Sequence, residues 1–238
     1  MNTETESMPS GSRTTAPALT VSDLHFRWSA DQPSLSFPDI RLAAGEHLFI
    51  HGPSGSGKST FLSLLAGMLS PESGTIHMLG NDIHKARAGD RDRFRADHIG
   101  VIFQQFNLVP YLTAETNVTL PCRLSDSRRD ATHPNPMAEA HRLLTALTIP
   151  EDHWHRKVTE LSIGQQQRVA AARALIGSPE LVLADEPTSA LDTDNRDRFL
   201  DLLLTLAEER NTSVLFVSHD RTLAPHFHHQ IELDGGVR

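Results

Sequence analysis

The sequence has little cysteine, few aromatic residues and no long hydrophobic run. Of its 238 residues 5% are aromatic, and Cys122 is the one cysteine. A single cysteine cannot form a disulfide within the chain, which suits a reducing compartment, and we expect Cys122 to be a half-buried structural thiol. No apolar run approaches the roughly 20 residues that cross a bilayer, and the N-terminus lacks the apolar core of a signal peptide. These absences predict a chain that stays in the cytoplasm, so any membrane role must come through a partner.

Positive charge is also scarce. The chain has 22 lysines and arginines against 30 aspartates and glutamates, which gives a formal net charge of -8. A protein held on nucleic acid by many phosphate contacts needs a basic face, so we expect no nucleic-acid partner. With 238 residues the chain can form one sizeable domain, or one core with a subdomain, but not a tandem of two full domains.

The sequence does contain an alternation of strand and helix patterns. Residues 1–18 are small, polar and aperiodic, and are expected to be a disordered lead-in. ALTVSDLHFRW and EHLFI have the pattern of strands, and the short runs ELVLADEP and TSVLFVSHD are typical of buried parallel strands. Residues of about 105–164 are richer in helical patterns. The sequence predicts one α/β domain over 19–238, with a mostly parallel sheet core (about 19–104 and 165–238) and an inserted α-helical subdomain.

The segment GPSGSGKS, residues 52–59, fits the phosphate-binding pattern G-x-x-x-x-G-K-[ST]. It follows a predicted strand and opens a predicted helix, so backbone N–H groups and the positive helix end converge on one anion. Gly55 and Gly57 let the backbone wrap closely around phosphates. Lys58 would reach the β- and γ-phosphates, and the Ser59 hydroxyl would ligate Mg²⁺. The predicted nucleotide-binding residues of this segment are Gly52, Pro53, Ser54, Gly55, Ser56, Gly57, Lys58, Ser59 and Thr60.

Two carboxylates follow the apolar strand pattern of LVLADE. A phosphate-binding loop needs a carboxylate across from it to hold the metal, and Asp185 is the candidate, through water or directly. Glu186 beside it is placed to orient and deprotonate an attacking water, which is the work of a general base. Without the phosphate-binding loop, this acidic pair would be interpreted as a helix cap or loop charge.

Five segments in order, GPSGSGKST, FQQ, LSIGQQQR, VLADEPTSALD and VSHD, resemble the nucleotide-binding subunit of ATP-binding cassette (ABC) transporters. The resemblance covers nearly all of the chain after the first 18 residues. It implies a P-loop NTPase fold of ABC type, ATP and Mg²⁺ as cofactors, and a nucleotide-sandwich homodimer. In that family the signature run, here LSIGQ, closes over the ATP held by the second copy.

The resemblance therefore implies that Ser162, Gly164 and Gln165 face the γ-phosphate of the other copy's nucleotide. A serine and a glycine at a helix N-terminus form an anion-binding device, which needs no catalytic acid or base. Taken alone, the run would be a serine N-cap before an amphipathic helix. Ile163 stands where the family usually has glycine, so either this backbone position is ordinary here or the cradle is altered.

Four further residues match the family one at a time. Gln104 in FQQ matches the glutamine that senses the γ-phosphate and the metal, and His219 in VSHD matches the histidine that contacts the γ-phosphate and steadies the water. Asp192 in SALD matches the residue that communicates across the dimer. Trp28 stands where the family has an aromatic that stacks on adenine. The alternatives are a solvated glutamine, a loop histidine, a helix cap and, for Trp28 or the nearby Phe26, simple packing.

The histidine cluster HFHH remains outside these motifs. His226 and His229 lie three apart, which would suit one helix face, but no carboxylate or cysteine frames them in the sequence. We expect a solvated C-terminal segment and not a metal site.

The resemblance implies an ATP-hydrolysing motor subunit that lies on the cytoplasmic face of the inner or plasma membrane and drives separate integral membrane permease subunits. IGVIFQQFNLVPYLTAETNVTLP is similar to the branch of lipoprotein-releasing and macrolide-exporting systems. The alternatives are an importer ATPase, a soluble ABC ATPase that works on DNA or ribosomes, and a regulatory module that holds ATP without hydrolysing it. Nothing in the motifs names the transported molecule, because the motor touches nucleotide and permease only.

Overall fold

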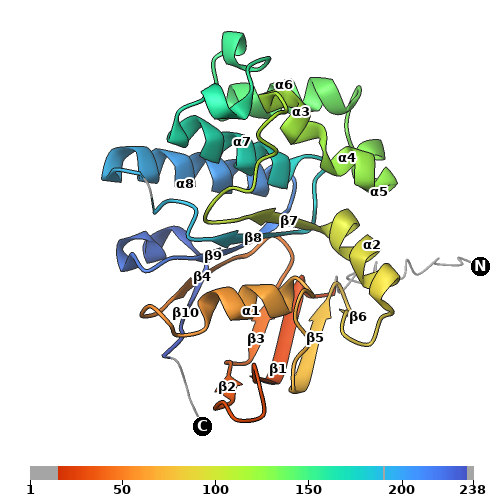
Figure 1. The fold of residues 1–238 in the computed structure, drawn as a ribbon, viewed down its shortest axis with the longest axis vertical. Helices are drawn as coiled ribbons and strands as arrows, with labels where there is room; N and C mark the ends of the chain where they lie inside the picture. Colours follow the sequence, from red (N-terminus) through yellow and green to blue (C-terminus); the bar gives the residue numbers. More distant parts are fainter. Residues whose placement is uncertain (1–15, 190, 235–238) are drawn as a thin grey trace, which may run out of the picture.

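The structure is a computed structural model that describes residues 16–189 and 191–234. Its centre is a parallel sheet with the strand order β10-β4-β9-β8-β7 (Figure 1). The strands are β10 (His229–Glu232), β4 (His47–His51), β9 (Ser213–Val217), β8 (Leu181–Asp185) and β7 (Ile99–Ile102). All residues of β4 and β9 are buried, as expected for strands covered on both faces. The predicted mostly parallel core is this sheet.

A second, antiparallel sheet lies across helix α1 (Lys58–Leu65) from the parallel sheet (Figure 1). The sequence motifs do not predict this second sheet. Its central strand β1 (Leu19–Phe26) pairs with β2 (Leu35–Ser36), β3 (Ile40–Leu42) and β5 (Ser73–Met78), and β5 pairs with β6 (Asn81–Asp82). Helix α1 (Lys58–Leu65) lies between the two sheets (Figure 1). Its Phe61 and Leu64 are fully buried in one cluster with Leu24 of β1 and Leu48 of β4. The antiparallel sheet therefore covers the helix that carries the phosphate-binding lysine.

Helices cover the other face of the parallel sheet (Figure 1). They are α3 (Ala114–Thr119), α4 (Pro121–Leu124), α5 (Asp126–Asp130), α6 (Pro136–Ala146), α7 (Ile163–Leu175) and α8 (Thr193–Glu208), with short 3-10 turns η1 (Glu151–His153), η2 (Val158–Glu160) and η3 (Arg221–His226). Helix α2 (Ala88–His98) leads into β7. Helix α7 packs on both α3 and β7. The predicted subdomain boundary at residue 164 falls within the first turn of this helix. It joins the helical subdomain to the sheet.

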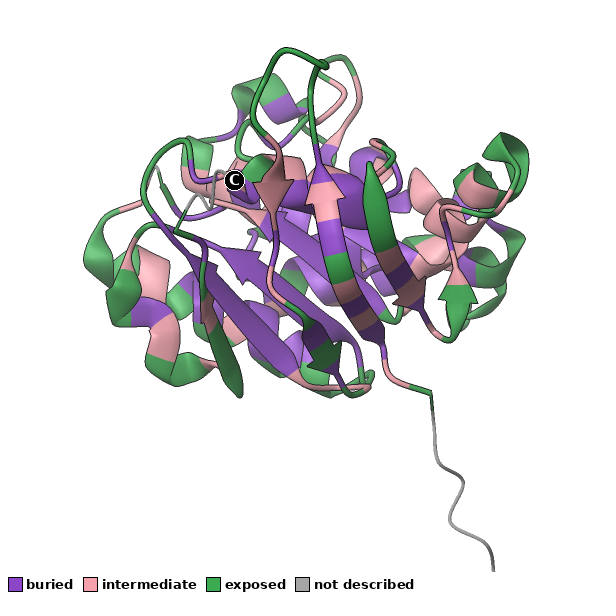
Figure 2. Ribbon diagram, turned by 90° about the horizontal axis from the view of Figure 1, so that it is seen from below, coloured by how far each residue is buried: buried purple, intermediate pink, exposed green. Residues whose placement is uncertain are grey.

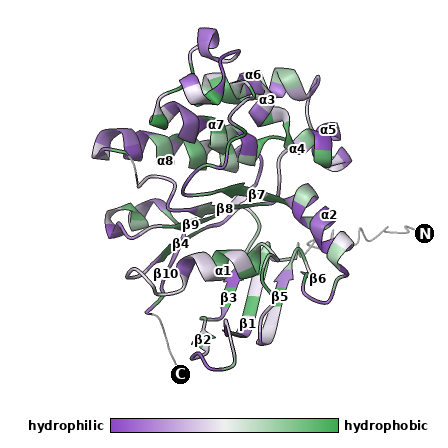
Figure 3. Cartoon of the chain, in the orientation of Figure 1, coloured by the Kyte–Doolittle hydropathy of each residue, from purple (hydrophilic) through white to green (hydrophobic). Residues whose placement is uncertain are grey.

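Burial follows the hydropathy of the chain. Figure 2 shows the strands of the parallel sheet largely buried, and Figure 3 shows hydrophobic residues along β7 and β8. Cys122 is 3% exposed, more buried than expected, and burial raises the pKa of its thiol. Of the predicted lead-in, residues 1–15 lie outside the described part of the chain, while Ala18 is 1% exposed and accepts a hydrogen bond from Leu79 N–H. No helix among the described residues has the length and apolar character to span a membrane.

Candidate nucleotide-binding site

The phosphate-binding segment forms a tight turn between β4 and α1. Gly55 and Gly57 adopt φ values of +81° and +90°, a left-handed conformation that glycine adopts without strain. A Cβ on Gly52 would lie 2.2 Å from the Leu233 carbonyl oxygen, so the backbone there passes too close for any side chain. The first N–H groups of α1 have no acceptor within the helix, and they face the turn. The turn is therefore shaped to receive an anion at a positive helix end.

Lys58 places a cation at the same turn. Its side chain is 7% exposed, and its ammonium group donates hydrogen bonds of 2.9 Å to the carbonyl oxygens of Gly52 and Pro53. These bonds hold the ammonium at the mouth of the turn, where the N–H groups of α1 also converge. A charged nitrogen with three donors can add a phosphate oxygen as a further acceptor.

The ends of separate elements meet in a pocket of about 390 Å³. Its lining residues are Ser54, Gly55, Lys58, Ser59, Gln104, Glu186 and His219. Gln104 follows β7, Glu186 follows β8 and His219 comes just after β9, so the carboxyl ends of three parallel strands supply the far wall. In open α/β sheets ligands bind in the crevice at this edge. The fold thus gathers residues that lie far apart in the sequence.

Asp185, the last residue of β8, lies against Ser59 beside this pocket. Burial raises the pKa of the Asp185 carboxyl, and the charge of Glu186 raises it further, while the hydrogen bond with Ser59 opposes the shift. A divalent cation held between the carboxylate and the hydroxyl would lower that pKa again, because it favours the charged form. Oxygen ligands of this kind are those that Mg²⁺ prefers, so the residues fit the ion.

Glu186 occupies an unusual backbone conformation. Its φ is +43°, a left-handed value that is costly for a residue with a Cβ. The conformation is held by a hydrogen bond of 2.9 Å from Glu186 N–H to the Val217 carbonyl oxygen. The side chain turns toward His219, whose Nδ1 lies 3.2 Å from Glu186 Oε2. A carboxylate beside a histidine in the pocket of Lys58 can accept a proton from a water that the histidine also contacts.

The signature residues lie elsewhere on the surface. Ser162 is the N-cap of α7: its Oγ accepts a hydrogen bond from Gln165 N–H, and Gln165 Oε1 accepts one from Ser162 N–H. This reciprocal pair is a capping box. Ile163 is the first residue of the helix and is 59% exposed, without a positive φ, so the ordinary backbone is the correct alternative there. Ser162, Gly164 and Gln165 do not line the pocket that contains Lys58.

Two other predicted residues also stand apart from this pocket. Asp192 is exposed and caps α8, accepting hydrogen bonds from Asn195 N–H at 3.0 Å and from its side-chain amide at 2.7 Å. Those bonds lower the pKa of the Asp192 carboxyl. Trp28 is 60% exposed, whereas Phe26 is 6% exposed and packs edge-on against it with ring centroids 5.0 Å apart. Phe26 is therefore the core aromatic, and Trp28 is the ring free to meet a ligand.

His226 and His229 of the HFHH segment lie on two different elements. His226 ends η3 and His229 begins β10, so the two side chains do not share a helix. His228 Nδ1 accepts a hydrogen bond of 3.1 Å from His47 N–H, and His229 Nε2 lies 3.0 Å from Glu46 Oε2. Within residues 16–189 and 191–234 no group of three or more His, Cys, Asp or Glu side chains could hold a metal ion.

Sequence reasoning missed the residue that fixes the turn after Gln104. Phe106 and Asn107 have φ values of +59° and +47°, and both carbonyl oxygens accept hydrogen bonds from the Arg173 guanidinium, at 2.6 and 2.7 Å. Arg173 lies on α7, so the signature helix and the Gln104 turn are tied together. No local pattern identifies this arginine, whereas the S-x-x-Q spacing of the capping box was readable.

Several known proteins are similar to this chain in sequence or in fold. A family model described as "ABC transporter" matches residues 36–189. The lipoprotein-releasing system ATP-binding protein LolD of Hydrogenovibrio crunogenus is 41% identical over 207 residues, 86% of each chain. The ABC transporter ATP-binding protein YtrE of Bacillus subtilis is 38% identical over 205 residues, 86% of this chain and 87% of that protein. The dimeric post-hydrolysis structure of the ATP-binding cassette MJ0796, bound to ADP and Pi, superposes with a TM-score of 0.79 at 32% identity, covering 92% of this chain and 95% of that one.

Proposed function

This chain belongs to the ABC transporter family, and from that premise we propose that it is the motor subunit of an exporter or lipoprotein-releasing system. It is an ATP-binding ATPase with the α/β P-loop NTPase fold of that family. In the proposed cycle two copies close over two Mg-ATP, the motion passes to a separate membrane permease, and hydrolysis reopens the dimer. The single observation that carries the proposal is that Lys58, Gln104, Glu186 and His219 line one pocket.

The polar residues in and beside the pocket have proposed tasks in hydrolysis. Lys58 binds the β- and γ-phosphates, and the N–H groups of α1 bind phosphate oxygens. Glu186 accepts a proton as the oxygen of water bonds to the γ-phosphorus and the bond to the ADP oxygen breaks. His219 steadies that water and the γ-phosphate. Ser59, Asp185 and Gln104 would hold Mg²⁺, which neutralises developing charge on the phosphate oxygens.

The signature segment is proposed to act on the nucleotide of the second copy. Ser162 is exposed and lies outside the pocket of its own chain, so it is available to a partner. A test mixes a Ser162→Arg chain with a Lys58→Ala chain, since one composite site in each mixed dimer then has an intact P-loop and an intact signature. Recovery of ATPase activity supports action in trans. Two inactive parents whose mixture stays inactive, although mixed dimers form, would contradict it.

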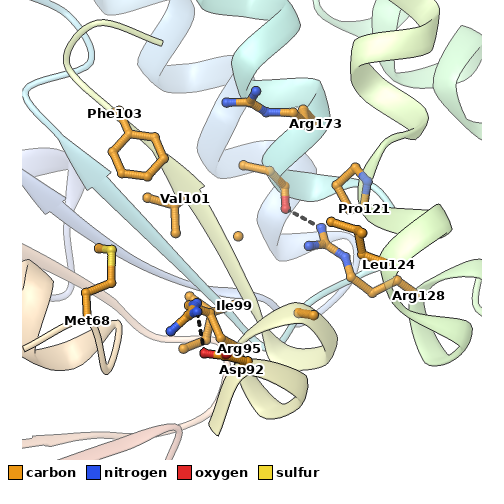
Figure 4. Close-up of a pocket in the computed structure, with 13 residues that line it drawn as sticks. Met68, Asp92, Arg95, Ile99, Val101, Phe103, Pro121, Leu124, Arg128 and Arg173 are labelled. Atoms are coloured by element: carbon orange, nitrogen blue, oxygen red, sulfur yellow. Dashed lines mark hydrogen bonds and ion pairs between the residues drawn. The ribbon is translucent and has the colours of Figure 1, made fainter. Parts of the chain in front are cut away.

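A groove of about 340 Å³ is the proposed docking site of the permease (Figure 4). Val101 and Phe103 of the β7 end form its floor, and Leu124 of α4 and Met68 form exposed apolar edges, 79% and 50% exposed. Arg173, which holds the Gln104 turn, also lines it. A short amphipathic helix of a permease fits such a groove. Its docking would act directly on the turn that carries Gln104.

The proposed docking is tested by substitutions on the helical subdomain. Leu124→Asp should abolish recovery of the permease with the motor subunit, while ATP binding by the purified chain stays unchanged. The matched control is Met137→Asp on α6, which places the same charge on a 39% exposed methionine outside the groove. If Leu124→Asp retains the permease, or if Met137→Asp loses it to the same extent, the docking site is elsewhere.

The branch of the family rests on the similarity to LolD. The experiment is to trap a Glu186→Gln chain with ATP in its native membranes, solubilise it gently and identify the co-purifying proteins by mass spectrometry. A permease with few spans and a large extracytoplasmic domain supports export or lipoprotein release. A many-span permease with a solute-binding protein means import. Recovery of no membrane protein, although the dimer has formed, would mean a soluble ATPase role.

A further inference from the structure

We propose that His153 is a positioning residue for the signature segment: its Nδ1 holds the side-chain amide of Gln165, and through it the capped N-terminus of α7. The contact is a hydrogen bond of 2.8 Å from Gln165 Nε2 to His153 Nδ1. The inference rests on the proposed action of the signature on a second copy's nucleotide. It assigns a role to a histidine that none of the sequence motifs includes.

Both polar atoms of the Gln165 side-chain amide form hydrogen bonds. Its Oε1 accepts the hydrogen bond from Ser162 N–H at 3.0 Å, and its Nε2 donates to His153. The Ser162 N–H can only donate, so it requires the amide oxygen and places the NH₂ toward the histidine. With Nδ1 as the unprotonated ring nitrogen, His153 accepts from that NH₂ and holds the side chain in the orientation in which the capping box forms.

The other half of the capping box needs this support. The hydrogen bond from Gln165 N–H to Ser162 Oγ is 3.3 Å, just longer than the usual N–H···O range. The bond from the Ser162 N–H to the Gln165 side chain is shorter, at 3.0 Å, and is the one that His153 secures. Ser162 is exposed, so these contacts, and not burial, set its orientation.

His153 is itself attached to a rigid part of the helical subdomain. It ends η1, and the next residue, Trp154, is 9% exposed with its indole N–H donating to the Ile149 carbonyl oxygen at 3.1 Å. The Trp154 ring stacks on His141 of α6 with centroids 4.4 Å apart, and His141 lies 2.8 Å from Glu115 of α3. The hydrogen bond of His153 thus connects the α3 and α6 framework to the first turn of α7.

The expected effect follows from the loss of one hydrogen bond per signature. A neutral hydrogen bond of this kind contributes a factor of roughly five to an equilibrium. Each closed dimer contains two signatures, so removing both acceptors should weaken ATP-driven dimerisation by up to about 25-fold. Binding of nucleotide to the P-loop of the same chain should not change, because His153 does not line that pocket.

The experiment uses the full chain in the Glu186→Gln background, where ATP-bound dimers accumulate. Dimerisation against ATP concentration is measured by analytical ultracentrifugation, and the affinity of the monomer for a fluorescent ADP analogue is measured in parallel. His153→Ala should weaken dimerisation and leave ADP affinity unchanged, with a fall in Tm of no more than about 2–4 °C, as expected for one hydrogen bond. His153→Asn should restore dimerisation, because its Oδ1 occupies the place of Nδ1. If the alanine variant dimerises like its parent, or the folded asparagine variant fails to restore it, the inference is wrong.

A double-mutant cycle tests whether His153 acts through Gln165. In a Gln165→Ala background, His153→Ala should cause no further loss, whereas an equal further loss would overturn the inference. Should His153→Ala fail to fold, His153→Gln takes its place, since it keeps size and polarity but puts its acceptor where Nε2 was. The Ser162→Arg variant distinguishes failure of the proposed action of the signature in trans from failure of the role of His153. If it dimerises normally, the action of the signature in trans is wrong; if it blocks dimers that His153→Ala leaves intact, only the role of His153 is wrong.

Discussion

Replacing Asn117 by alanine tests how the loop that follows the Gln104 turn is held. Asn117 of α3 is fully buried, and its Oδ1 accepts a hydrogen bond of 2.8 Å from Val109 N–H. Its Nδ2 donates to the carbonyl oxygens of Val109 and Thr113, both at 3.1 Å. One side chain thus fastens a loop that contains no regular structure to the first helix of the helical subdomain.

The magnitude follows from which groups lose their partners. The Val109 carbonyl also accepts from Leu112 N–H, and the Thr113 carbonyl from Asn117 N–H, so both keep a donor after substitution. The Val109 N–H loses its side-chain acceptor, which costs about 1–3 kcal/mol if the group stays dry, and the two donated bonds contribute about 1 kcal/mol each. Val109 is half-buried, so water can reach it in part. We expect Asn117→Ala to lower the free energy of unfolding by about 3 kcal/mol.

Urea denaturation followed by circular dichroism measures this change. In a chain of this size, about 3 kcal/mol corresponds to a fall in Tm of about 6–12 °C. Asn117→Asp should be at least as harmful, because a carboxylate would face two carbonyl oxygens. The matched control is Asn81→Ala, an exposed asparagine with one hydrogen bond to Leu79, where we expect a loss under about 0.5 kcal/mol. A loss below about 1 kcal/mol for Asn117→Ala at unchanged m-value, or a stable aspartate variant, would refute the reasoning.

Three further substitutions test other parts of the account. A hydrogen bond of 2.9 Å between His98 Nδ1 and Glu180 Oε2 raises the pKa of His98. The stabilisation by this pair is therefore complete below the unfolded histidine pKa of about 6.5, and it is lost as the pH rises through the raised pKa of the folded state. His98→Gln should lower Tm at pH 5.5 and have little effect at pH 9. Ile163→Gly should bring no gain in ATPase activity, because the backbone at Ile163 is already helical, and it should cost up to about 1 kcal/mol in helix stability. A gain in activity would mean that isoleucine alters the anion-binding N-terminus of α7. Gly177→Ala should destabilise the chain, because φ is +70° and the new Cβ would lie 2.5 Å from the Arg128 carbonyl oxygen; a Tm equal to the parent's would contradict this.

The sequence predicted those parts of the site that are built locally. The turn from β4 through Gly57 to α1 is set by eight consecutive residues, whose glycines and helix start are readable in order. Asp185 and Glu186 follow from their place after an apolar strand. The positions of Gln104 and His219 came from the family resemblance, and the fold brings both to the same pocket.

The parts that depend on contacts between distant segments could not be predicted. Strands β2 and β6 have two residues each and β3 has three, too short for any periodicity, so the antiparallel sheet is defined by its pairing with β1 and β5. The left-handed backbone of Glu186 depends on a carbonyl oxygen of β9. Arg173 reaches carbonyl groups 66 and 67 residues away in the sequence. No local pattern records such pairings.

The most direct test of the central claim is the behaviour of the Glu186→Gln chain with Mg-ATP. Phosphate release and molar mass are measured on the same sample, with Glu72→Gln, a surface carboxylate paired with Arg27, as the matched control. If Glu186 is the base for the hydrolysis that reopens the dimer, Glu186→Gln should lose turnover by a factor of at least about 10² and accumulate as a dimer holding two ATP molecules. The Glu72→Gln control should behave as the parent. A monomer with parental turnover would contradict the account.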